Sequence, residues 1–230
     1  MTVSEPKVSP LWKKLLFPAI LLLLIAGGVA GSMLATRDPQ THVHGWLDRL
    51  LWQRIPAPDF TLTDHNGEPV RLSQFRGKVV VFSFGFTHCP NICPATLSHF
   101  SAIREAVPEP IRHQVQFLFI TVDPERDSPE RLKEYVPFFD PHFLGLIGTP
   151  EEVRDVVYRY KASFRHGKPR AGDPKDYFVD HTADAFLIGP DGQWELSYPF
   201  EELPKTERIA ADIARLVNVG GGPREARRRD

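Results

Sequence analysis

Two cysteines are the residues of this sequence best suited to chemistry. Cys89 and Cys93 are the only cysteines among 230 residues, and three residues separate them. A disulfide scaffold would use more cysteines, and a bridge across so short a loop would contribute only about 2 kcal/mol. The pair therefore indicates a redox dithiol, or a metal site in which soft thiolates hold copper(I) or zinc.

The elements around the cysteines place both thiols where a ligand would bind. Residues 78–84 form a continuous β-branched and aromatic run, which is typical of a strand buried on both faces of a sheet. The cysteine loop follows, and Pro94 suits the first turn of a helix after it. Ligands bind at the carboxyl ends of strands in open α/β sheets. A helix amino terminus also favours thiolate over thiol.

A third ligand would come most naturally from one of nine histidines. His181 stands just before a predicted strand at 183–188, as the thiols stand just after the strand at 78–84. If the two strands pair in antiparallel fashion, these ends meet. Topology alone leaves His181 one candidate among the nine.

The remaining pattern predicts an α/β fold with a central mixed sheet flanked by helices. Strands alternate with helices, which requires a mostly parallel sheet, and a terminal hairpin adds an antiparallel edge. Such an order fits a thioredoxin-like fold. The other predicted features are a hairpin turning at Asn66-Gly67, strands at 115–122 and 143–147, a helix capped by Asp127 with Ser128 at its first position, a helix opened by a Thr149–Glu152 capping box, a long polar loop at 165–180, strands at 183–188 and 194–198 around a turn at 190–192, and a helix at 201–218.

The amino-terminal segment predicts export of the domain. Residues 15–35 carry no charge and are long enough to span a bilayer. Lys13 and Lys14 before them favour a cytoplasmic amino terminus. The alternative is a cleaved signal peptide, since residues 28–30 resemble a cleavage site.

These features divide the chain into five parts. They are a cytoplasmic segment at 1–14, a transmembrane anchor at 15–35, a linker at 36–55, a folded domain at 56–218 and a disordered tail at 219–230. The linker fits either an amphipathic helix at the membrane surface or a helix packed on the domain. The formal net charge of −1 gives no bulk attraction to nucleic acid, so no nucleic-acid partner is expected.

Three motifs in this order resemble the SCO/SenC family. Residues 86–94 read FTHCPNICP, residues 121–130 read TVDPERDSPE, and residues 180–182 read DHT. The resemblance covers about 56–218. It implies a thioredoxin-like domain anchored in the inner membrane, facing the periplasm, with copper(I) or copper(II) held by Cys89, Cys93 and His181. It also implies that the partners are the copper-bearing subunit of cytochrome c oxidase and other periplasmic copper carriers.

Asp123, Asp127 and Asp180 match acidic positions of the same family. Local roles compete with functional ones: Asp127 is predicted to cap a helix, and Asp123 before Pro124 suits a turn. Asp180 lies next to the predicted ligand, and three roles stay open for it. It could orient the site, contact a partner or have a purely local role.

Three functions are compatible with the motifs. The first is a copper chaperone, which is not an enzyme, and the second is a thiol–disulfide reductase using Cys89 and Cys93. The third is a peroxidase, because the opening at 56–60 and the strand-cysteine-helix layout resemble peroxiredoxins. Those enzymes carry threonine three residues before the reactive cysteine. Phe86 and Pro90 occupy that position here, which argues against a peroxidase.

Overall fold

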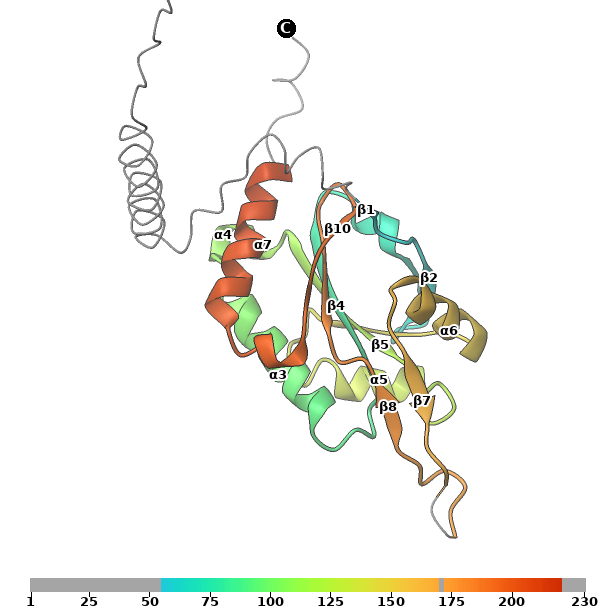
Figure 1. Ribbon diagram of the computed structural model, residues 1–230. Coiled ribbons are helices and arrows are strands. Elements are labelled where there is room, and N and C mark those ends of the chain that lie inside the picture. The colour runs from blue at the N-terminus through green and yellow to red at the C-terminus, as the bar shows by residue number, and fades with distance from the viewer. Residues whose placement is uncertain (1–54, 170–171, 221–230) are drawn as a thin grey trace, which may run out of the picture. The chain divides into compact units, whose positions relative to one another are not determined.

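An eight-stranded mixed sheet forms the centre of the domain (Figure 1). The computed structural model describes residues 55–169 and 172–220. The strand order is β1-β10-β9-β4-β5-β6-β2-β3, and β7 and β8 pair separately. The strands are β1 (Ile55–Pro56), β2 (Thr61–Asp64), β3 (Pro69–Arg71), β4 (Val79–Gly85), β5 (Val115–Thr121), β6 (Leu144–Ile147), β7 (Phe164–His166), β8 (Val179–His181), β9 (Ala185–Ile188) and β10 (Gln193–Tyr198).

Helices lie on both sides of this sheet. They are η1 (Leu72–Phe75), α3 (Ile92–Ala106), α4 (Glu109–Arg112), α5 (Pro129–Tyr135), α6 (Pro150–Arg159), η2 (Phe200–Glu202) and α7 (Thr206–Gly220). Helices α3 and α7 pack together on one face, and α6 lies on the other (Figure 1). The predicted α/β class with a mixed central sheet flanked by helices is therefore confirmed.

Strand β4 is the most buried element and organises the sheet. All seven of its residues are buried, as the uninterrupted apolar run predicts. It pairs in parallel with β5 and in antiparallel fashion with β9. Ser83, near the end of β4, stands opposite Ala185 at the start of β9. The antiparallel pairing that would bring His181 close to the thiols is therefore present.

Aromatic side chains fill the core on both faces of the sheet. Phe82 stacks on Phe186 with 5.0 Å between ring centroids, and the Tyr160 ring meets Phe82 edge-on at 4.9 Å. A second group, Phe100 and Phe117, packs between α3 and β5. Offset and edge-on pairs of this kind add about 0.5–1.5 kcal/mol each beyond burial.

One predicted helix cap is confirmed and another is wrong. Thr149 and Glu152 form the expected capping box at the start of α6, each side chain accepting from the other's backbone N–H. For α5 the cap is Ser128, whose hydroxyl accepts from the N–H of Arg131, with Pro129 as the first helical residue. Asp127 is turned inward, toward residues distant in sequence.

The predicted polar loop at 165–180 is wrong at both of its ends. Residues 164–166 and 179–181 pair as the antiparallel hairpin β7–β8. The N–H of Gly167 continues this ladder to the carbonyl of Phe178 at 2.7 Å. The strands are short, and much of their surface is exposed. The apolar alternation that marks a half-buried strand is consequently missing from the sequence.

The predicted helix at 201–218 is divided in two. A 3-10 turn ends at Glu202, and α7 begins at Thr206. Pro204 lies between them and has no N–H to continue a helical ladder. The β9–β10 hairpin around residues 190–192 is confirmed.

Several predictions fall on other parts of the chain. The anchor at 15–35, most of the linker and the tail beyond residue 220 lie outside the described residues. Within residues 55–169 and 172–220, no helix has the length and apolar character needed to cross a membrane.

His65 is a buried titratable group beside β6. Its Nδ1 accepts the N–H of Gly145 at 3.0 Å, which requires that nitrogen to be unprotonated. Burial lowers the pKa of His65 below its ordinary value; Asp64 opposes this shift and Lys133 adds to it. The neutral ring is therefore the form that the fold favours.

We expect His65 to make the fold less stable in mild acid. The unfolded chain binds a proton near pH 6.5, about the ordinary pKa of histidine. The folded chain binds it at lower pH, so the stabilisation is complete above about pH 6.5 and declines below it. Urea unfolding at pH 7.5 and 5.5 should show a smaller pH effect in His65→Asn than in wild type. The exposed His113→Asn should behave as wild type, and equal pH effects in all three proteins would exclude this role.

Candidate metal centre

The loop that follows β4 carries both cysteines. Cys89 lies in the loop, and Cys93 is the second residue of α3. Gly85 ends β4 directly beneath them. A Cβ at Gly85 would collide with the ring of Phe119 and stand 3.0 Å from Sγ of Cys93. Glycine at this position therefore lets the Cys93 sulfur pack against the end of the strand.

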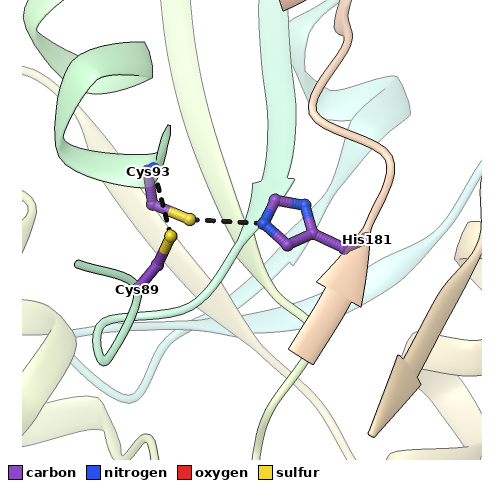
Figure 2. A group of neighbouring side chains, drawn as sticks. All are labelled: Cys89, Cys93 and His181. Carbon is purple, nitrogen blue, oxygen red and sulfur yellow. Dashed lines mark hydrogen bonds between the residues drawn. The ribbon is translucent and has the colours of Figure 1, made fainter. Parts of the chain in front are cut away.

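The structure brings all three predicted ligands together. Sγ of Cys93 lies 3.4 Å from Nε2 of His181, and Sγ of Cys89 accepts the N–H of Cys93 at 3.5 Å. Figure 2 shows the imidazole reaching the sulfurs from the end of β8. One donor atom from each residue falls within 4.8 Å of the others, and no other such group occurs among the described residues.

The imidazole of His181 has the tautomer that a metal ligand needs. Its Nδ1 lies 3.0 Å from the carbonyl oxygen of Thr182, and a carbonyl can only accept. The proton is consequently on Nδ1, and the lone pair of Nε2 faces the sulfurs. A second hydrogen bond of this kind commonly fixes a ligating histidine. Phe86 supports the ring edge-on, with 5.7 Å between centroids.

The two thiols differ in burial and acidity. Cys89 is 9% exposed and Cys93 only 1%, and neither forms a disulfide. A hydrogen bond from the Cys93 thiol lowers the pKa of Cys89 to about 3, and burial opposes this shift. The same hydrogen bond, together with burial, raises the pKa of Cys93. Cys89 is thus the thiolate and Cys93 the thiol that donates to it.

A surface hollow opens beside this group. Its volume is about 250 Å³, and its lining includes Cys89, Ile92, Phe178, His181 and Phe200. Cys93 does not line it. A partner that entered the hollow would meet Cys89 and His181 first.

Asp127 fixes the loop that carries the cysteines through hydrogen bonds. Its buried carboxylate accepts the N–H of Thr87 at 3.1 Å and the Thr87 hydroxyl at 2.6 Å. The hydroxyl of Thr121, at the end of β5, donates to it at 2.5 Å. His88 lies 3.4 Å away on the exposed side. The predicted capping role is replaced by one that ties the loop to the adjacent strand.

The other described histidines have separate surroundings. His65 accepts from Gly145, His142 pairs with Asp140, and His99 packs on Phe200. His42 and His44 lie outside the described residues. Asp180 is largely exposed and lies 3.8 Å from the equally exposed Arg165. Its carboxylate therefore does not belong to the Cys-Cys-His group.

Fold and site together define a class of protein. A thioredoxin-like domain carries two thiols on its strand-to-helix loop, and a histidine from a separate hairpin completes a group of three side chains that could hold a metal ion. The family model described as SCO1/SenC matches residues 53–218. The chain belongs to the SCO1/SenC family.

Relatives in two eukaryotes are similar over most of the chain. The mitochondrial protein SCO2 of Saccharomyces cerevisiae is 35% identical over 214 residues, which are 91% of this chain and 69% of that protein. The mitochondrial SCO1 homolog of Mus musculus is 38% identical over 213 residues, covering 91% of this chain and 72% of the mouse protein.

Solved structures agree with the fold. ScoI of Bradyrhizobium japonicum, determined with copper bound, is 36% identical with a TM-score of 0.62, over 70% of this chain and 99% of that one. The apo Sco1 protein of Thermus thermophilus is 41% identical with a TM-score of 0.64, over 70% of this chain and 91% of its own.

Proposed function

We propose that this chain is a copper metallochaperone. It binds a copper ion through Cys89, Cys93 and His181 and delivers it to the dinuclear copper site of cytochrome c oxidase during assembly. The observation that carries the proposal is the convergence of these three donor atoms within 4.8 Å. Membership of the SCO1/SenC family supports the acceptor, and other periplasmic copper carriers are the natural donors.

The donor set fits copper. Two thiolate sulfurs are soft ligands that favour copper(I), and an imidazole also suits copper(II). Zinc accepts the same donors, but structural zinc sites are closed by four ligands. The copper-bound ScoI of Bradyrhizobium japonicum supports copper over zinc. Cys89 and His181 line the hollow, so an incoming protein can replace ligands one at a time.

Copper binding should depend on His181 as well as on the thiols. Metal analysis and absorption spectra of the purified full-length chain should show one copper ion and a thiolate-to-copper(II) band. His181→Ala should lose that band and weaken copper binding by about tenfold or more, and Cys93→Ala should abolish stoichiometric binding.

His113→Ala is the matched control, since this exposed histidine follows α4 and precedes β5, at the edge of the sheet opposite the end of β4 that leads to the thiols. It should bind copper as wild type does. Copper binding by Cys93→Ala as tight as that of wild type would refute the proposal.

A thiol–disulfide reductase is the second candidate, and the inequality of the two thiols favours it. Cys89 lines the hollow as a thiolate, while Cys93 is buried behind it. The Cys89 thiolate would attack an acceptor disulfide, forming a mixed disulfide and releasing one acceptor thiolate. Cys93 would then pass its proton to the released acceptor thiolate and attack Sγ of Cys89, which expels the second acceptor thiolate. The acceptor gains two electrons, the Cys89–Cys93 disulfide forms, and a dithiol reductant must restore the pair.

A mixed-disulfide trap distinguishes the roles of the two cysteines. Metal-free Cys93→Ala, incubated with a disulfide-bonded peptide, should accumulate the peptide on Cys89, as mass spectrometry would show. Cys89→Ala should accumulate far less, because Cys93 is buried. Reduction should survive His181→Ala, unlike copper binding. Equal trapping by both single-cysteine variants would contradict this assignment.

The proposal also places the domain on the periplasmic face of the inner membrane. The 21 uncharged residues at 15–35, preceded by Lys13 and Lys14, support a single-pass anchor. The chain, tagged at both ends, should stay with the membrane after carbonate extraction and keep its amino-terminal tag. Protease added to spheroplasts should remove the carboxyl-terminal tag. A soluble chain without the amino-terminal tag would indicate a cleaved signal peptide instead.

A further inference from the structure

A buried charged cluster joins the hairpin that carries His181 to the end of β5. This Asp123 cluster consists of Asp123, Arg126 and Tyr177. The side chain of Asp123 is fully buried and that of Arg126 is 8% exposed, and Nε of Arg126 donates to Asp123. The hydroxyl of Tyr177 donates to the other carboxylate oxygen at 2.8 Å. None of these three residues is one of the proposed copper ligands.

Arg126 contacts the hairpin segment through hydrogen bonds and a ring contact. Its guanidinium donates to the carbonyls of Lys175 and Tyr177, at 3.0 and 2.9 Å, both within the β7–β8 connection. Its Cζ atom also lies over the Tyr177 ring, 3.8 Å from the centroid. Stacking and a fork of donors are what distinguish arginine from lysine. The Arg126 side chain thus contacts both the backbone of the β7–β8 connection and the ring of Tyr177.

The cluster is connected to the metal ligands through Phe86. The guanidinium carbon lies 5.6 Å from the centroid of the Phe86 ring, and that ring also contacts the His181 imidazole, with 5.7 Å between centroids. The N–H of Phe86 in turn donates to Sγ of Cys93 at 3.5 Å. His166, on β7, adds a ring contact to Tyr177 and lies 3.8 Å from Asp123. The hairpin is therefore held to the sheet on the side that faces the thiols.

We propose that Arg126 is a positioning residue for the third copper ligand: by binding the β7–β8 segment to Asp123, it keeps Nε2 of His181 beside the sulfur of Cys93. His181 belongs to the separate two-stranded sheet, and its strand has no partner in the central sheet among the described residues. Without Arg126 the hairpin segment loses a buried attachment to Asp123, and the core contact of Val179 on β8 remains. The thiols, which α3 and β4 hold, would stay in place while the imidazole moves away.

Hydrogen exchange in the metal-free full-length chain tests the positioning by itself. In Arg126→Gln, the amides of Gly167 and Thr182, which bond across the hairpin, should exchange about tenfold faster or more, as expected for local opening. Amides of β4 and β5 should keep their wild-type rates. Arg165→Gln is the matched control, because it removes the same charge from the hairpin surface, where Arg165 only faces exposed Asp180. Unchanged hairpin exchange in Arg126→Gln would overturn the proposal.

A double-mutant cycle on copper affinity tests the route of the effect and rests on the proposed copper binding. Arg126→Gln should weaken copper binding by about tenfold, the range seen when a ligand loses its supporting contact. In the His181→Ala background the same substitution should change affinity less than about twofold, because the ligand on which it acts is gone. An equal loss in both backgrounds would mean that Arg126 does not act through His181.

The remaining outcomes are also decisive. If Arg126→Gln does not fold, Tyr177→Phe replaces it, since it removes one hydrogen bond to Asp123 and keeps the stacked ring; it should shift exchange and affinity in the same direction by a smaller factor. No shift in either measurement would then overturn the proposal. If the wild-type chain binds no copper, the proposed function fails, and the exchange experiment alone still decides whether Arg126 holds the hairpin.

Discussion

The antiparallel pairing of β4 with β9 is the constraint on which the metal centre depends. A parallel neighbour would bring its own carboxyl end to this edge of the sheet, whereas an antiparallel one brings its amino end and the segment before it. That segment contains His181. Since β5 lies on the other side of β4 in parallel register, its carboxyl end meets the same edge with Asp123 and Asp127 following it. Ligands and supporting carboxylates from three distant stretches thus converge.

Burial of two carboxylates beside two thiols requires compensation. An isolated buried charge is unstable in a protein interior unless it is paired or hydrogen-bonded. Asp127 receives donors from Thr87 and Thr121, and Asp123 receives them from Arg126 and Tyr177. Hydrogen bonds to charged groups contribute about 1.5–3 kcal/mol each. Each aspartate supports a different part of the site. Asp127 holds the loop that carries the cysteines, and Asp123 holds the hairpin that carries His181.

Local patterns predicted the fold well where local physics decides it. The buried run of β4, the Thr149–Glu152 capping box and the β9–β10 turn all depend on neighbours in sequence. The inward role of Asp127 depends on Thr87, forty residues away, and no spacing rule reports such a contact. A capping rule in fact misassigned Asp127, since Ser128 and Pro129 satisfy the start of α5 without it.

The residues of the site were likewise predictable from the sequence only in part. Spacing and position identified Cys89 and Cys93 from the sequence alone, because a strand-to-helix loop with two thiols has few other uses. His181 needed the family resemblance, since its strand is too short and too exposed to leave an apolar pattern. Arg126 lies in one of the family motifs, but neither it nor Tyr177 was predicted to be buried, because arginine in a polar segment is ordinarily solvated. Only the folded chain shows that the Arg126 side chain is buried over the partly buried ring of Tyr177.

The unequal attachment of the ligands suits a carrier better than a permanent metal site. Cys93 lies in a fifteen-residue helix against a fully buried strand, so its sulfur can move little. His181 lies on a three-residue strand outside the central sheet, where local opening is less costly. A metal held by both kinds of ligand would lose its imidazole before its deeper thiolate. Because His181 and Cys89 face the hollow, that first vacancy would open toward an incoming protein while Cys93 still held the ion. The same asymmetry would let the metal-free pair act on a disulfide through Cys89, so one architecture accommodates both proposed activities in sequence.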